Sequence, residues 1–138
     1  MTRTNILNII ADRHRLTNYL EIGVQNVRNN FNKIICPNKV GVDPAVDHAH
    51  VHKVTSNEFF LHNKHIYDLI FIDGLHELDR VRMDFLNSLR FLSDRGFIVI
   101  HDTLPDNELS TLVPRQTRVW YGDIYKFVFE LKIGRAHV

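Results

Sequence analysis

The sequence predicts an α/β fold in which a doubly wound, mainly parallel sheet carries helices on both faces. Two observations predict this class. Apolar runs such as LIFI at residues 69–72 are short and nearly continuous, which is typical of strands covered on both faces. Segments with helical spacing of apolar residues alternate with these runs over short connections, which indicates right-handed βαβ units.

The individual elements follow from local pattern. Strands are predicted where a short apolar run ends in glycine or a polar residue, at residues 19–23, 39–43, 67–73 and 96–101. Helices are predicted at residues 4–16, 55–63, 79–93 and 123–131, with residues 26–35 as a weaker helix candidate.

Two of the predicted helices carry further signals. In residues 79–93, one face carries Val81, Phe85, Leu89 and Leu92. Gly96 is the glycine expected to end that helix before the next strand. In residues 55–63, Thr55 or Ser56 is the expected N-cap, and Phe59 and Phe60 are expected to turn inward.

The chain is expected to form one domain, and its final residues look foreign to it. Its 138 residues are 44% apolar and 24% charged, which fits a single globular domain. The last six residues, IGRAHV, continue no pattern and match a reading frame of a common sequencing adapter. We therefore expect residues 1–132 to be a partial domain and residues 133–138 to be a non-native tail.

Composition excludes several classes of partner. The formal net charge is +1, so the composition provides no strong attraction to nucleic acid or anionic lipid. The apolar runs are far shorter than the roughly 20 residues that span a bilayer. The single cysteine, Cys36, cannot form an internal disulfide, which favours the reducing cytoplasm. The sequence carries no indication of the oligomeric state.

Polar residues follow all four predicted strands. They are Glu21 and Gly23, then Asp43, then Asp73 with His76, and last His101 with Asp102. Ligands of open α/β sheets bind beyond the carboxyl ends of the strands, so we expect one site at this edge. Asp43 follows Gly23 by about 20 residues, the offset at which an acid grips ribose hydroxyls. A turn-forming role for Asp43 before Pro44 is the alternative.

The residues after the last two strands have three open interpretations. Asp73, His101 and Asp102 could bind Mg²⁺, and a histidine ligand also admits Mn²⁺, Fe²⁺ or Zn²⁺. Alternatively, His101 or His76 acts as a general base without a metal. In the third interpretation these groups only cap loops.

A further histidine cluster lies in the segment HAHVH, at His48, His50 and His52. On a strand, three alternating imidazoles would share a face that zinc could use. The segment lacks strong strand character, so a solvated loop is favoured.

An ordered series of motifs resembles a known family. YLEIG, VGVDP, DLIFIDGLH and GFIVIHDTLP, followed by WYGDIYK, are similar to class I S-adenosylmethionine-dependent methyltransferases. The most similar subgroup is the small-molecule O-methyltransferase-like set with IDGxH and HD motifs. The resemblance runs from about residue 19 to about residue 131. It implies a Rossmann-like, doubly wound, mainly parallel sheet with helices on both faces, here lacking the final strands.

The resemblance also implies roles for the strand-end residues. Glu21 and Gly23 match the motif around the methionine part of the cofactor, and Asp43 matches the acid that holds the ribose. Asp73 matches the acid beside the methyl donor, which also binds the cation in metal-dependent relatives. His101 and Asp102 match further ligand positions, although those relatives often have Asp followed by Asp or Asn. Gln25, Asn26 and Val27 stand where another glycine is usual, and a branched side chain there could crowd the cofactor.

The resemblance implies S-adenosylmethionine-dependent O-methylation of a small molecule or sugar hydroxyl by in-line transfer. Asp73, His76 and His101 are the expected catalytic residues, with S-adenosylmethionine as cofactor and a divalent cation such as Mg²⁺ as an optional one. A non-catalytic nucleotide-binding or cofactor-binding module is one alternative. A metal-dependent oxygenase or hydrolase that uses the Asp/His cluster is another, since fold does not fix function.

Overall fold

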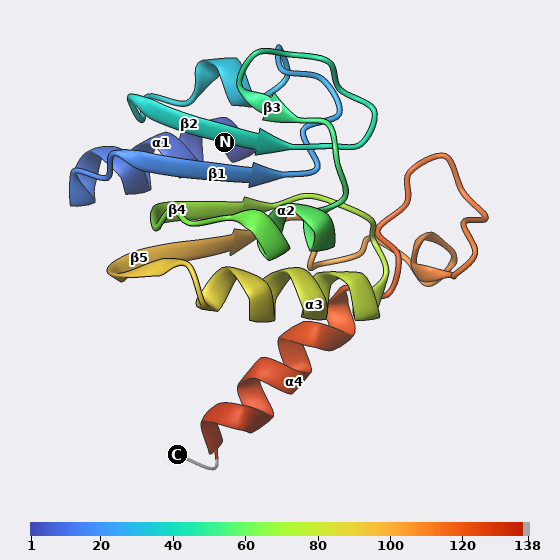
Figure 1. The fold of residues 1–138 in the computed structure, drawn as a ribbon. Coiled ribbons are helices and arrows are strands. Elements are labelled where there is room, and N and C mark those ends of the chain that lie inside the picture. The colour runs from blue at the N-terminus through green and yellow to red at the C-terminus, as the bar shows by residue number, and fades with distance from the viewer. Residues whose placement is uncertain (137–138) are drawn as a thin grey trace.

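The computed structural model describes residues 1–136, with side chains through Lys132. Four α-helices, five strands and two short 3-10 helices follow one another along this part of the chain (Figure 1). In chain order they are α1 (Arg3–His14), β1 (Asn18–Ile22), η1 (Phe31–Lys33), β2 (Asn38–Val42), β3 (Val51–His52), α2 (Ser56–His62), β4 (Tyr67–Ile72), α3 (Leu78–Leu89), β5 (Leu92–Ile100), η2 (Leu109–Thr111) and α4 (Tyr125–Ala136).

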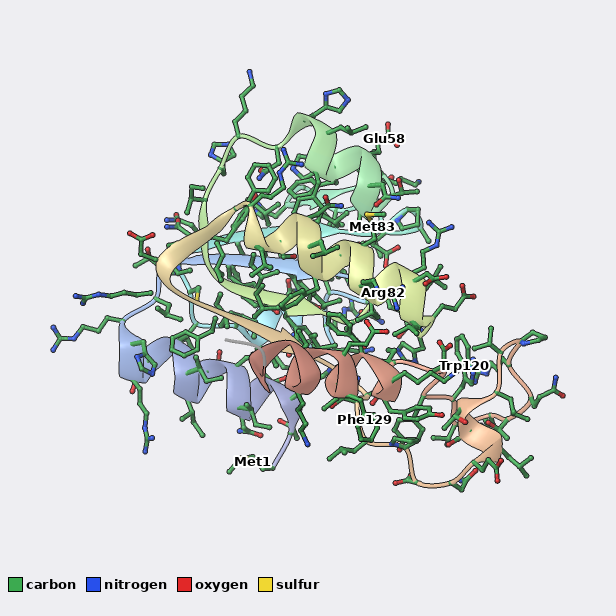
Figure 2. All side chains as sticks on the ribbon, turned by 90° about the horizontal axis from the view of Figure 1, so that it is seen from below. Met1, Glu58, Arg82, Met83, Trp120 and Phe129 are labelled. Carbon is green, nitrogen blue, oxygen red and sulfur yellow. The ribbon has the colours of Figure 1, made fainter. Side chains whose placement is uncertain are left out.

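The five strands form one parallel sheet in the order β3-β2-β1-β4-β5. The chain starts in the middle, runs outward through β2 and β3, and returns to build β4 and β5 on the other side. Helix α1 covers one face, and α2 and α3 cover the other (Figures 1 and 2). The predicted doubly wound architecture is therefore confirmed, and the direction of winding changes between β1 and β4.

Alternate residues of each strand feed two cores. On the α1 face, Leu7 and Ala11 pack with Tyr19, Leu69 and Phe71. On the other face, the side chains that pack together come from α2 and from the intervening strand positions, Phe59, Phe60, Leu20, Ile70 and Ile72. The prediction that Phe59 and Phe60 turn inward is confirmed, and Thr55 is the N-cap, accepting a hydrogen bond from the Glu58 amide.

Helix α4 packs against α3. Ile124 and Phe127 form a small apolar cluster with Val81. Arg82 of α3 adds a two-pronged ion pair with Glu130, at 2.6 and 3.1 Å. No helix among residues 1–136 is long and apolar enough to cross a membrane.

Two expected boundaries around α3 and β5 are wrong. Helix α3 ends at Leu89, and β5 begins at Leu92 with Gly96 inside it rather than at a helix end. Strand β5 starts early because Leu92 pairs with Tyr67 of β4 and the Ser93 hydroxyl donates a hydrogen bond to Asp68 at 2.9 Å.

The segment 26–35, a weak helix candidate, contains only η1. Four asparagines lie in it, and asparagine competes with helix formation through its own side-chain hydrogen bonds. Asn30 turns inward and donates to the carboxylate of Glu21 instead.

The chain around the three alternating histidines also differs from expectation. Val51 and His52 form the short strand β3 beside Gly41 and Val42, although a loop was predicted. The histidine ring nitrogens do not converge there. Within the described part of the chain, the one acid and histidine group compact enough for a metal ion lies elsewhere, among residues after β4 and β5.

Helix α4 runs further than predicted, through Ala136. Four of the six residues expected to be a non-native tail are thus helical, and residues 137 and 138 lie outside the described residues. The origin of residues 133–138 stays a prediction.

The ends of the strands lie at one level of the sheet. Ile22 pairs with both Val42 and Ile72, and Ile72 pairs with Ile100. The residue after each strand donates its amide to the last residue of the neighbouring strand. These bonds join Gly23 to Val42 (2.9 Å), Asp43 to His52 (3.1 Å), Asp73 to Ile22 (2.8 Å) and His101 to Ile72 (3.0 Å). The register therefore brings the predicted site residues into one row.

Gly23 allows the loop after β1 to lie against the turn after β4. Its φ is +84°, and a Cβ atom there would lie 2.2 Å from the carbonyl oxygen of Asp73. An L side chain therefore meets both an unfavourable backbone conformation and a backbone clash. Gly74 is different, because an added Cβ would have its nearest neighbour at 3.5 Å, which is ordinary contact.

We predict that Gly23→Ala lowers the free energy of unfolding by at least about 2 kcal/mol, because the loop must move away from Asp73. Gly74→Ala, the matched control, is expected to change it by less than about 1 kcal/mol. Urea denaturation followed by circular dichroism measures both. Equal stability of the two variants would contradict the close approach of Gly23 to Asp73.

Candidate active site

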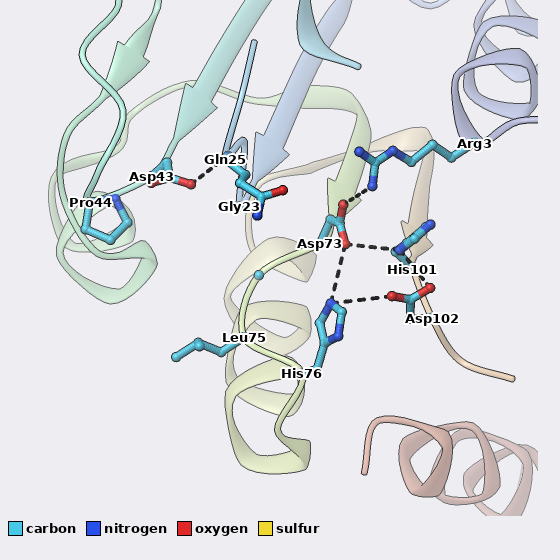
Figure 3. Close-up of a pocket in the computed structure, with 11 residues that line it drawn as sticks. Arg3, Gly23, Gln25, Asp43, Pro44, Asp73, Leu75, His76, His101 and Asp102 are labelled. Atoms are coloured by element: carbon cyan, nitrogen blue, oxygen red, sulfur yellow. Dashed lines mark hydrogen bonds and ion pairs between the residues drawn. The ribbon is translucent and has the colours of Figure 1, made fainter. Parts of the chain in front are cut away.

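A cavity of about 420 Å³ opens at the carboxyl edge of the sheet (Figure 3). It lies between β1 and β4, where the sheet changes its direction of winding. Open α/β sheets bind their ligands at this place. The residues that line it are Arg3, Gly23, Gln25, Asp43, Pro44, Asp73, Gly74, Leu75, His76, His101 and Asp102.

The structure brings six of the seven predicted site residues to this cavity. They are Gly23, Asp43, Asp73, His76, His101 and Asp102. Glu21 does not line it. Arg3 and Gln25 do line it, although the motifs did not single them out as site residues.

Asp73 is the centre of the charged cluster. Its Oδ2 accepts a hydrogen bond from Arg3 Nη1 at 2.5 Å. Its Oδ1 lies 3.1 Å from His101 Nδ1 and 3.6 Å from His76 Nε2 (Figure 3). Burial by itself raises the pKa of Asp73, but the two histidines and Arg3 outweigh it and hold the pKa below its ordinary value. Asp73 is therefore a carboxylate at neutral pH.

His101 sits between two carboxylates. Its Nδ1 lies 3.0 Å from Asp102 Oδ1 and 3.1 Å from Asp73 Oδ1, but neither oxygen is in line with the N–H, so these contacts are mainly electrostatic. Asp102 and then Asp73 raise the pKa of His101 to about 9. His101 is thus an imidazolium at neutral pH and cannot accept a proton there, which leaves His76 as the base candidate.

His76 has its two ring nitrogens in different environments. Nδ1 lies 2.8 Å from the Trp120 carbonyl oxygen. The imidazole ring of His76 also stacks on the indole ring of Trp120, with centroids 5.5 Å apart. A carbonyl oxygen only accepts, so Nδ1 carries the proton and Nε2 faces the site. Nε2 is 3.6 Å from both Asp73 and Asp102. Asp73 is the main cause that raises the pKa of His76 above its ordinary value.

Three side chains could together hold a cation. One ligand atom each from Asp73, His76 and Asp102 lie within 4.8 Å of one another. His76 completes this compact group, whereas the expected set of Asp73, His101 and Asp102 stays a prediction. This group offers two carboxylates and one imidazole, and a backbone carbonyl holds the second nitrogen of that imidazole. Such a set of ligands suits Mg²⁺, Mn²⁺, Fe²⁺ or Zn²⁺.

A family model described as "Methyltransferase domain" matches residues 5–103, which hold β1 to β5 and every cavity residue except Arg3. The chain belongs to the class I S-adenosylmethionine-dependent methyltransferase family. No curated protein matches the chain.

In this methyltransferase, the carboxylate of Asp43 accepts two hydrogen bonds from the backbone. Its Oδ2 accepts the Gln25 amide and its Oδ1 accepts the Ala45 amide, each at 2.8 Å. Each carboxylate oxygen has a second lone pair, and Asp43 also lines the cavity. The turn-forming and ligand-binding interpretations of Asp43 are thus compatible.

Glu21 lies in the α1-side core beneath the cavity, with 1% of its surface exposed. Its Oε2 accepts hydrogen bonds from the Tyr19 hydroxyl (2.7 Å) and from Asn30 Nδ2 (2.9 Å). Asn30 in turn accepts from the Thr4 hydroxyl at 2.7 Å, which ties α1 to β1. Burial raises the pKa of Glu21 to about 7. Direct contact between Glu21 and the cofactor stays a prediction.

Val27 does not crowd the cavity. It packs against the core cluster of the α1 face and is absent from the cavity lining. The loop after Gly23 thus places this branched side chain away from the cavity, and its effect on cofactor binding stays a prediction.

We predict that Glu21→Gln flattens the pH dependence of stability. Because the folded-state pKa of Glu21, about 7, lies above its ordinary value of 4.5, the folded protein binds this proton more tightly than the unfolded chain does. The resulting stabilisation is complete below pH 4.5 and is lost as the pH rises through about 7. Its size is at most about 3 kcal/mol. Unfolding free energies across this range should fall less in the variant, and equal slopes would contradict the assignment.

We predict that Asp102→Asn lowers the pKa of His101 from about 9 toward its ordinary 6.5, because it removes the largest cause of the shift. Asparagine suits the positive φ of Asp102, 53°, so the fold should persist. NMR titration of the His101 ring protons measures the change, with Asp106→Asn as control. An unchanged His101 pKa would contradict the ion pair.

Proposed function

We propose that this methyltransferase moves the methyl group of S-adenosylmethionine to a hydroxyl group of a small molecule or sugar. One observation carries the proposal: Asp43, Gly23, Asp73 and His76 line a single cavity in that order across the sheet. At one end of this order, the carboxylate of Asp43 can accept hydrogen bonds from a ribose diol. At the other end, the imidazole of His76 can accept a hydroxyl proton.

The donor would lie across the ends of β1 and β2. Gly23 lines the cavity at the end of β1 and has no side chain to occupy it. The free lone pairs of Asp43 would accept hydrogen bonds from the ribose hydroxyls. The methyl-bearing sulfur would then point toward Asp73 and His76.

The proposed reaction is a single in-line displacement. The acceptor oxygen attacks the methyl carbon, the carbon–sulfur bond breaks, and S-adenosylhomocysteine leaves with the electron pair on sulfur. The hydroxyl proton passes to His76 Nε2, whose Nδ1 stays on the Trp120 carbonyl. Alignment of donor and acceptor contributes up to about 7–11 kcal/mol, and a positioned base contributes about 10²–10⁴-fold in rate.

A divalent cation is a second candidate for activating the hydroxyl. The donor cluster of Asp73, His76 and Asp102 favours it. When bound, such an ion lowers the pKa of a coordinated hydroxyl. In that case His76 is a ligand rather than the base, and chelation with EDTA abolishes turnover.

The net charge of the chain and the aromatic side chain beside His76 both favour a small molecule as the methyl acceptor. The formal net charge of +1 provides no general attraction to nucleic acid or lipid. Trp120 stacks on His76 and belongs to the long segment after β5, so it offers an aromatic surface beside the base. Cys36 is buried and free, which is consistent with a cytoplasmic protein.

We predict that His76→Ala lowers methyl transfer by about 10²–10⁴-fold and changes S-adenosylhomocysteine affinity by less than threefold. His62→Ala, at an exposed histidine of α2, is the control and should leave both unchanged. Transfer from radiolabelled S-adenosylmethionine to a panel of sugars, phenols and hydroxy acids measures activity, and calorimetry measures affinity.

Two outcomes of that experiment would oppose the proposal. Tight S-adenosylhomocysteine binding by the wild type without transfer to any acceptor would favour a non-catalytic binding module. Metal-dependent oxygenation or hydrolysis without the methyl donor would favour the oxygenase or hydrolase interpretation.

A further inference from the structure

Arg3 lies outside the segment that the family model matches, yet it reaches the centre of the cavity. It belongs to the first turn of α1, and its guanidinium points at Asp73 from the side opposite His76 (Figure 3). Of the residues that line the cavity, Arg3 is the sole lysine or arginine. The other charged groups there are the acids Asp43, Asp73 and Asp102 and the imidazolium of His101, which lies between Asp73 and Asp102.

The position of Arg3 is fixed by its neighbour. The Thr4 hydroxyl donates to Asn30, which donates to the buried Glu21. This chain of hydrogen bonds holds the first turn of α1 against the loop after β1. The guanidinium is thus presented from a rigid support rather than from a mobile terminus.

Arg3 is poorly placed for the stability of its own helix. A cation in the first turn opposes the helix dipole, and no acidic residue in that turn compensates for it. Its described hydrogen bond uses one of five N–H donors, the Nη1 contact with Asp73. Its side chain keeps 30% exposure, so the remaining donors are open to a ligand in the cavity.

We propose that Arg3 is the receptor for the carboxylate of the donor's amino-acid end. Arg3 and Asp73 present opposite charges side by side beside Gly23, which complements the α-carboxylate and α-ammonium of an amino acid. A guanidinium matches a carboxylate in geometry as well as in charge. This inference rests on the proposed use of S-adenosylmethionine.

The test compares two ligands and three variants. S-adenosylhomocysteine has the amino-acid end, and 5′-methylthioadenosine has the same nucleoside and thioether without it. Arg3→Gln should weaken S-adenosylhomocysteine binding by about 10- to 100-fold, and Arg3→Lys by less, because lysine keeps the charge but not the fork. Binding of 5′-methylthioadenosine should change by less than twofold. Arg13→Gln, at an exposed arginine in the last turn of α1, is the matched control.

Each outcome decides between explanations. An equal loss of affinity for both ligands in Arg3→Gln would overturn the proposal, since Arg3 would then only support the cavity. Unchanged affinity for both would also overturn it and would leave Arg3 as a partner of Asp73 alone. If the wild type binds neither ligand, the proposed function fails instead. Thermal melts of each variant show whether the fold is retained.

Discussion

The parallel register of the sheet is the constraint on which the site depends. Val42, Ile22, Ile72 and Ile100 stand at one level, so the residues that follow them emerge side by side. A slip of one residue in any strand would turn its terminal side chain to the opposite face. The cavity is therefore set by apolar packing on both faces of the sheet, and its polar residues contribute chemistry rather than cohesion.

Charge balance decides what the polar residues can do. Asp73 is partly buried, and it stays ionised because Arg3 and the two histidines surround it. Asp102 and Asp73 keep His101 protonated at neutral pH, so the two histidines of the site have different roles. His101 supplies fixed positive charge, while His76, held through the Trp120 carbonyl, directs a nitrogen toward the space where an acceptor would lie. Removing Asp73 would lower the pKa of both histidines, because its carboxylate raises each of them.

Local patterns were sufficient to predict most of the fold and most of the site. The change from apolar to polar residues at Asp43, Asp73 and His101 marks the strand ends, and parallel sheets align such ends. The two-residue strand β3 is too short to produce a pattern. Gly96 resembles a helix terminator locally, and the pairing of Leu92 with Tyr67 overrides that signal. Arg3 was not foreseeable, because its partner is 70 residues away and the contact depends on how α1 is seated. The role of His76 likewise depends on a contact with Trp120, 44 residues away, and that of His101 depends on its place between Asp73 and Asp102.

The edge of the sheet between β2 and β5 is the proposed donor site. Titration of the isotopically labelled protein with S-adenosylhomocysteine, followed by amide NMR shifts, tests it most directly. We predict that the largest shifts occur at Gly23, Gln25, Asp43, Gly74 and His76, the cavity residues nearest the proposed donor. Shifts confined to the separate hollow around His62 and His65, beside α2, or no shifts at millimolar ligand, would contradict the account.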